Sequence, residues 1–241
     1  MKPWYSIKAQ SADTTTVYIY EQIGEDWFGE GVTAKQFVRD FAAIETPTIS
    51  LRINSPGGSV FDGMAIANAV RRHPATTTAY VDGLAASIAS VIAVSGDRMV
   101  MADNALLMVH NAWGVAVGNA EDMRSSADVL DKVDEGIVAA YAGKSGKDEA
   151  DVLAVMAAET WFTASEALEF GLADEVSGAM QLAACFDLSR FKHPPAALAV
   201  ETPVSVDHGD GPEAVVDHDE PEAATPARLR KVAGRFVSEK R

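Results

Sequence analysis

The amino-acid sequence predicts an α/β fold in which short buried strands alternate with covering helices. Two β-branched, apolar stretches, TTTVYIY (14–20) and TTTAYVD (76–82), have the composition of strands, and the stretches between them carry apolar residues at helical spacing. Repeated strand, helix, strand units pack as layers with parallel pairing. With 241 residues and 48% hydrophobic content, the chain can bury the core of one sizeable domain.

The alternation continues along most of the chain. The predicted elements are, in order, a strand at 14–20, a helix at 32–44, a strand at 47–53, a helix at 60–73, a strand at 76–82, a small-residue helix at 87–95, strands at 98–103 and 105–111, and a long helix at 119–146. Along the long helix, one apolar stripe recurs every three or four positions: Met123, Ala127, Leu130, Val133, Ile137 and Tyr141. This stripe packs either on its own domain or on another subunit.

From residue 193 the composition changes, so we predict a folded domain at 1–192 and a tail at 193–241. The segment 201–222 contains eight acidic residues and no Lys or Arg, which predicts disorder. The last stretch, ARLRKVAGRFVSEKR, instead carries six Lys or Arg against one Glu, and its apolar residues are spaced for a helix face. The opposite charges suggest a targeting or assembly role for the tail, or an association between its two halves.

The composition excludes several classes of partner and site. A net charge of −15 argues against nucleic acid and anionic membranes as partners, because both attract clustered Lys and Arg. A single cysteine, Cys185, excludes an internal disulfide framework and a multi-cysteine metal site. The N-terminus lacks the apolar core of a signal peptide, and the longest apolar stretch is too short to span a bilayer. We therefore expect a cytoplasmic protein whose partners are proteins.

Three short stretches carry the residue types that acyl transfer by a serine requires. Ser87 in VDGLAASIAS (81–90) stands where an apolar helix begins, and NSPGGSV (54–60) directly follows a strand. A nucleophile at Ser87 needs paired amides for the oxyanion, which Gly58 and Ile88 can supply. Each feature also has an ordinary interpretation, a helix cap for the serine and a strand-to-helix turn for the two glycines.

The third stretch, LLMVHNAW, supplies a base. His110 ends an apolar strand, and imidazole is the usual base for a serine hydroxyl at neutral pH. Alone, it is as readily explained as a core histidine with a backbone bond. His73 lies beside two arginines, and His193, His208 and His218 lie in or near the predicted tail. Of the five histidines, only His110 follows a run of apolar residues.

Together these residues resemble a known family. INSPGGSVFDGMAIANAV (53–70), DGLAASIAS (82–90), LLMVHNA (106–112) and TWFTASEALEFGLADEV (160–176) are similar to the ordered signature blocks of ClpP, the serine protease of the ClpP/crotonase fold. The resemblance implies that fold with a long projecting helix, Ser87 as nucleophile, His110 as base, and the amides of Gly58 and Ile88 as the oxyanion hole. It also implies a ring-like homo-oligomer, protein or peptide substrates, and no metal or organic cofactor.

The sequence departs from the family pattern in three places, and two of these departures resemble one branch of the family. The family's aspartate position falls on Glu159, which is either the third member of the triad or a solvated helix-end carboxylate. The short segment between Ser87 and His110 and the acidic tail resemble the head maturation proteases of tailed phages and prophages, which trim capsid and scaffold proteins in the assembling prohead. On that interpretation the protein works in the bacterial host cytoplasm and within proheads.

Other functions compete with this one. A housekeeping Clp-type subunit shares the same motifs, and an inactive structural or scaffolding homologue would explain the missing aspartate. A Ser-Lys peptidase would use Lys132 or Lys144, although both lie in hydrophilic surroundings where a lysine keeps its charge. A crotonase-type acyl-CoA enzyme uses the oxyanion amides without a nucleophile, so the presence of both Ser87 and His110 counts against it.

Overall fold

The computed structural model describes residues 4–9, 11–24, 33–179 and 186–195. Its strands are β1 (Tyr5–Ala9), β2 (Thr14–Ile19), β3 (Thr48–Ser55), β4 (Thr76–Ala86), β5 (Arg98–Ala102), β6 (Leu106–Val109), β7 (Thr160–Thr163) and β8 (Glu175–Ser177). Its helices are α1 (Ala34–Ala42), α2 (Val60–Arg72), α3 (Ile88–Ala93), α4 (Ala120–Ser145), α5 (Glu149–Ala157) and α6 (Ala164–Phe170). The predicted acidic and basic tail segments, 201–222 and 227–241, lie outside the described residues.

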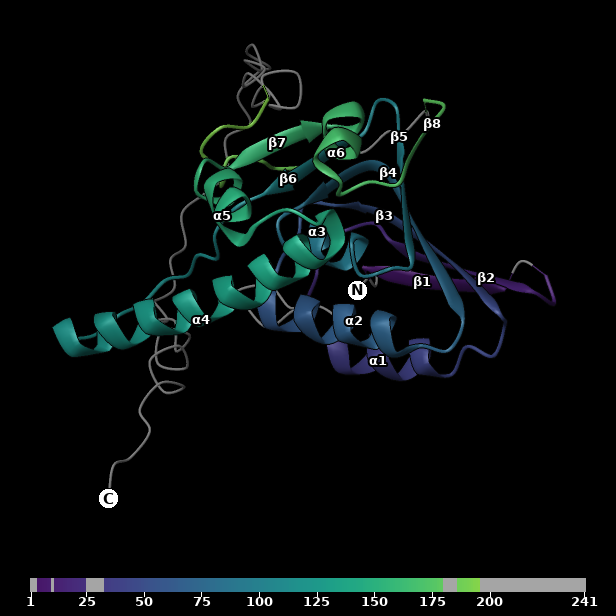
Figure 1. The fold of residues 1–241 in the computed structure, drawn as a ribbon. Coiled ribbons are helices and arrows are strands. Elements are labelled where there is room, and N and C mark those ends of the chain that lie inside the picture. Colours follow the sequence, from purple (N-terminus) through teal and green to yellow (C-terminus); the bar gives the residue numbers. More distant parts are fainter. Residues whose placement is uncertain (1–3, 10, 25–32, 180–185, 196–241) are drawn as a thin grey trace, which may run out of the picture. The chain divides into compact units, whose positions relative to one another are not determined.

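The strands form one sheet in the order β1-β2-β3-β4-β5-β8, with β6 paired to β4 and β7 paired to β6. Only the pairs β1–β2 and β6–β7 are antiparallel among the described strands. Because β2 to β5 follow one another across the sheet, right-handed crossovers place α1, α2 and α3 on the same face (Figure 1). The predicted α/β class and its parallel pairing are confirmed.

The core lies between this sheet and its helices. Ile49, Leu51 and Ile53 alternate along β3 with no exposed surface, and they share one hydrophobic cluster with Phe37 and Phe41 of α1. Burial of each such side chain contributes about 1.5–3 kcal/mol to folding. This cluster holds the strands in place, and the strands in turn position the loops that follow them.

Strand β4 is longer than the sequence predicts, and this extension creates the site. The strand prediction ended at residue 82, whereas β4 continues to Ala86. Its first half pairs with β5, and its last residues pair with β6, up to Ala86 opposite Met108. The carboxyl ends of two parallel neighbours therefore lie side by side, so the residues that follow them, Ser87 and His110, come together.

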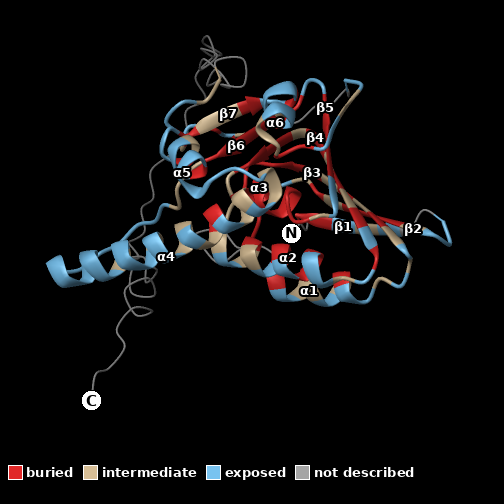
Figure 2. Cartoon of the chain, viewed as in Figure 1, coloured by how far each residue is buried: buried red, intermediate tan, exposed pale blue. Residues whose placement is uncertain are grey.

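Helix α4 confirms the predicted long helix. Asn119 and Asp122 form a capping box at its start, and Gly146 ends it in the left-handed region, at φ 68°. The predicted apolar stripe is divided: Ile137 and Tyr141 are buried, whereas the N-terminal half of the helix projects and is exposed (Figure 2). No helix in the described ranges is both long and apolar enough to cross a membrane.

Candidate active site

Ser87 occupies a strained turn between β4 and α3. Its backbone angles are φ 56° and ψ −131°, and Glu159 is the one other described non-glycine residue with a positive φ. Such conformations cost of order 1–3 kcal/mol and gather at functional sites. Although Ser87 is the N-cap residue of α3, its side chain makes no capping hydrogen bond. The helix-cap interpretation of this serine is therefore wrong.

His110 lies within hydrogen-bonding distance of Ser87. The Nε2 atom of His110 is 2.7 Å from the Oγ atom of Ser87, and the Ser87 amide donates to the carbonyl of Met108 at 3.0 Å. Burial lowers the pKa of His110 most, and the cations of Arg190 and Lys192 lower it further, against the carboxylates of Glu159 and Asp134. A neutral imidazole near pH 7 can accept the Ser87 proton.

Helix α4 supports Ser87 and His110 through hydrogen bonds to residues close to them in the chain. The Ser90 hydroxyl donates to the carbonyl of Ser87 at 2.5 Å and lies 2.7 Å from the hydroxyl of the buried Tyr141. Since the one proton of Ser90 is already used, Tyr141 donates to Ser90. Asp134, further along the same helix, accepts the backbone N–H of Ala112 at 2.7 Å, two residues beyond His110. Both sides of the Ser87–His110 pair are thus tied to one rigid element.

The loop of Pro56, Gly57 and Gly58 packs directly against Ser87. Gly57 has φ 89°, and a Cβ atom there would lie 2.7 Å from the Ala86 carbonyl oxygen and 2.8 Å from the Ser87 Cβ. No larger residue fits this approach. Within the described residues, the amides of Gly58 and Ile88 donate no hydrogen bond to the loops or strands around them. Both donors are available to a substrate oxygen next to Ser87.

Glu159 lies in the turn between α5 and β7 and is only 7% exposed, so it is not a solvated carboxylate. Its two oxygens accept the backbone N–H groups of Lys192, at 2.9 Å, and His193, at 2.6 Å. Burial raises the pKa of Glu159, but these two amides, the indole N–H of Trp161 and the charge of His110 together outweigh it, and the pKa is lowered overall. Within the described chain, Glu159 acts on His110 through its charge and makes no hydrogen bond to it.

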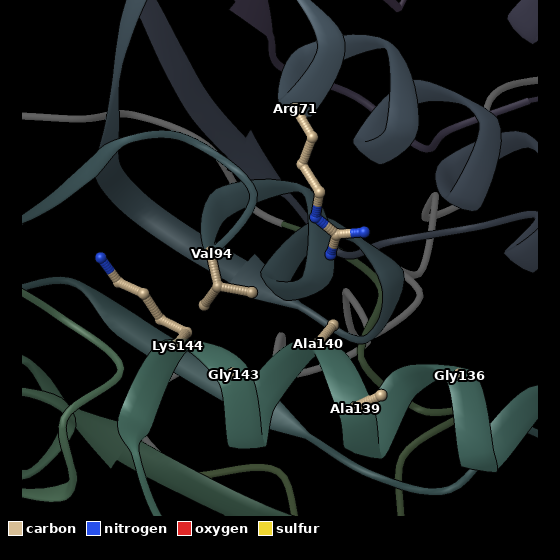
Figure 3. A pocket seen from close by; sticks show the side chains of 7 residues that line it. All are labelled: Arg71, Val94, Gly136, Ala139, Ala140, Gly143 and Lys144. Carbon is tan, nitrogen blue, oxygen red and sulfur yellow. The ribbon is translucent and has the colours of Figure 1, made fainter.

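The two predicted alternative bases lie elsewhere. Lys132 is exposed on α4, and Lys144 forms an ion pair with Asp174. Lys144 also borders a cavity of about 360 Å³ together with Arg71 and Val94, but neither Ser87 nor His110 lines that cavity (Figure 3). The partner of Ser87 is His110, which contradicts the Ser-Lys interpretation.

A second cavity, of about 270 Å³, opens beside His110. Its lining includes His110, Trp113, Glu159, Arg190 and Lys192. In the described parts of the chain, no three His, Cys, Asp or Glu side chains are grouped so that they could hold a metal ion. The Ser87–His110 pair has the arrangement that acyl transfer to a serine hydroxyl requires.

Comparison with known proteins agrees with this geometry. The Clp protease family model matches residues 2–180 of the chain. The chain belongs to the Clp protease family. It is 37% identical to the ATP-dependent Clp protease proteolytic subunit 1 of Protochlamydia amoebophila over 128 residues, which are 52% of this chain and 62% of that protein. The predicted ClpP-like family is confirmed.

Two further relatives in the Clp protease family have similar identity. The ATP-dependent Clp protease proteolytic subunit of Bacteroides fragilis is 35% identical over 130 residues, covering 53% of this chain and 63% of that protein. The subunit of the same name in Streptococcus pneumoniae is 35% identical over 156 residues, covering 63% and 79%. The chain thus spans less than two thirds of the length of the first two relatives.

Sequence reasoning missed the residues that support the site of this Clp protease family member. The sequence pattern identifies Asp134 and Tyr141 only as parts of a helix, and it predicts only a domain end near Arg190. The predicted boundary at 192/193 falls between the two residues whose amides bind Glu159. The aromatic and apolar residues Phe186, Leu188 and Phe191, just before the proline-rich stretch, were the available signal.

Proposed function

We propose that this protein is a serine endopeptidase that cleaves protein substrates through an acyl-enzyme on Ser87. The observation that carries the proposal is the 2.7 Å contact between Ser87 Oγ and His110 Nε2 at a strained backbone position. Membership of the Clp protease family supports the same reaction class. An inactive structural homologue would have no use for this strain, and a crotonase-type acyl-CoA enzyme would have no use for the nucleophile.

In the proposed reaction, Ser87 Oγ attacks the carbonyl carbon of a peptide bond while His110 Nε2 takes the hydroxyl proton. The amides of Gly58 and Ile88 stabilise the resulting oxyanion. The C–N bond then breaks as His110 returns the proton to the leaving amine, which gives the acyl-enzyme. Water hydrolyses this ester by the same proton transfers. The ionised carboxylate of Glu159 stabilises the imidazolium that forms in each half of the reaction.

A fluorophosphonate probe, which reacts only with activated serines, tests the proposal. We expect the full-length protein to be labelled at Ser87 and the variant Ser87→Ala to remain unlabelled. Ser6→Ala, which removes an exposed hydroxyl from β1, is the matched control and should label like the unmodified protein. An unlabelled wild-type protein would exclude the serine mechanism, and labelling that survives in Ser87→Ala would exclude Ser87 as the nucleophile.

For the biological role we propose head maturation in a phage or prophage, with capsid or scaffold proteins as substrates. The short segment from Ser87 to His110 and the acidic tail support it. The names of the relatives support a housekeeping Clp subunit at least as well. Two assays of the purified enzyme distinguish the two roles. One offers a capsid or scaffold protein alone, and the other offers casein with a Clp ATPase and ATP. Cleavage of casein only with the ATPase would favour the housekeeping role.

We also propose that the protein works as a homo-oligomeric ring. The segment that follows His110 and the projecting half of α4 expose large apolar side chains in the described chain, among them Trp113 at 55%, Val117 at 93% and Val129 at 47%. Such residues gather where another subunit covers them. Sedimentation velocity should give one large species, and Val129→Glu should shift it to smaller ones. A monomeric full-length protein would exclude the ring.

A further inference from the structure

Residues 186–193, here called the strap, lie against the strands that carry the site. Leu188 and Phe191 are each only 5% exposed, and they form a second hydrophobic cluster with Leu84, Ala86 and Met108. Ala86 directly precedes Ser87, and Met108 stands two residues before His110. The strap therefore covers the strand ends at which the proposed nucleophile and base are mounted.

Arg190 of the strap connects to the loop beside Ser87. One of its guanidinium N–H groups donates to the carbonyl of Pro56, the residue before Gly57 and Gly58. Its guanidinium also lies over the ring of Phe191, 4.9 Å from the ring centre. That same ring packs edge-on against His110, with 5.6 Å between ring centres. Arg190 thus contacts the loop of Pro56, Gly57 and Gly58 directly, and it reaches His110 through the ring of Phe191.

The position of Arg190 is unfavourable for the free energy of its charge. Burial lowers the pKa of Arg190, which the charge of Asp187 only partly opposes, and no carboxylate within the described residues forms an ion pair with it. Its Nε atom is buried and has no hydrogen-bond partner there. Burying an unpaired guanidinium is unfavourable, so packing alone does not account for an arginine at this position.

We propose that Arg190 is a positioning residue of the active site: it fixes the Pro56 carbonyl, and through it the amide of Gly58, relative to His110. The proposal rests on the proposed serine peptidase function. The hydrogen bond to Pro56 leaves the loop one orientation, so that the Gly58 amide is aimed before substrate binds. Arg190 and His110 also line the same cavity.

This placement has an electrostatic consequence. The charged groups that act on His110 are the carboxylates of Glu159 and Asp134, which favour its protonation, and the cations of Arg190 and Lys192, which oppose it. Removal of the Arg190 charge therefore raises the pKa of His110. The acid limb of the pH profile of kcat/KM should then move to higher pH, an effect that a purely structural arginine would not produce.

The test compares Arg190→Met, Arg190→Lys and the control Arg72→Met, an exposed arginine at the end of α2, in the full-length protein. The readouts are kcat and KM for a peptide substrate across the pH range, the thermal midpoint, and fluorophosphonate labelling. For Arg190→Met we expect kcat to fall about 10- to 100-fold with little change in KM. The acid limb of the kcat/KM profile should move to higher pH. Arg190→Lys should restore the acid limb but only part of kcat, because lysine lacks the planar guanidinium.

Several outcomes would overturn the proposal. Wild-type kcat in Arg190→Met would do so, as would a loss of activity that follows the thermal midpoint while the acid limb stays in place. If Arg190→Met fails to fold, Arg190→Lys decides: unchanged kcat in that variant contradicts a role for the bond to Pro56. A wild-type protein that does not label at Ser87 overturns the proposed function as well, whereas normal labelling with an insensitive Arg190 overturns this inference alone.

Discussion

Ser87 and His110 are held in a different way from Glu159. The first two follow adjacent parallel strands. Their positions are set by the register of β4 against β6 and by bonds of the nearby Ser90 and Ala112 to α4. Glu159 lies in a strained turn, and its carboxylate is held by amides of the irregular strap. The regular part of the site is built by the fold itself, whereas the Glu159 part depends on a short segment that folds back over it.

The largest effect is expected in the regular part. Ser87→Ala should lower kcat by roughly 10³-fold or more, because the covalent pathway is lost, while the thermal midpoint stays near that of the wild type. His110→Ala should be as damaging, and the double variant no worse, since the two residues act as one unit at 2.7 Å. Steady-state turnover of a peptide measures all three. Additive losses would show that the two residues do not share one proton transfer.

A pair of truncations tests the strap. A chain that ends after Pro195 keeps both amide donors to Glu159, whereas one that ends after Phe191 lacks them. The chain that ends after Pro195 should retain peptide turnover, as expected if the acidic and basic tail is dispensable for folding and hydrolysis. The shorter chain should lose about 10-fold or more, because the carboxylate of Glu159 loses both of its backbone donors. Equal turnover of the two chains would contradict a role for the strap amides.

The substitution Glu159→Gln should have a smaller effect. An amide oxygen can keep one backbone donor but not both, and the charge that favours the imidazolium is lost. We expect about a 10-fold loss in kcat, far less than the ~10⁴-fold loss that follows when a directly bonded triad aspartate is replaced by its amide. Glu166→Gln in the exposed capping box of α6 is the matched control. A loss near 10⁴-fold would mean that Glu159 bonds His110 directly during turnover.

The smallest expected effect is a displacement of the pH profile. Because burial lowers the pKa of His110, the base stays neutral to lower pH than a free imidazole. Activity should therefore fall only as the pH drops through a midpoint below the ordinary imidazole value of about 6.5. A profile of kcat/KM between about pH 5 and 8 measures this midpoint. A midpoint above the ordinary value would mean that Glu159, and not burial, dominates the site.

Much of the fold was predictable because it depends on local patterns. The helix over 119–146 was predicted nearly to its caps, since Asn119 and Gly146 mark its ends by their own backbone preferences. The pairing of Ser87 with His110 was predicted from residue types and family resemblance. The extension of β4 to Ala86 was not, because the small residues Gly83 to Ala86 have weak strand propensity and are held there by pairing with β6.

The sequence by itself predicted the α/β class with parallel pairing, because the periodicity of apolar residues is a local property. Residue types and family resemblance added Ser87 and His110 as the proposed nucleophile and base. Only the tertiary structure decided what surrounds them. The contacts of Glu159 with Lys192 and His193 join residues more than thirty positions apart, and that of Arg190 with Pro56 spans more than a hundred. Backbone amides and carbonyls make these bonds, and since every residue carries them, no side-chain pattern can predict which ones will meet.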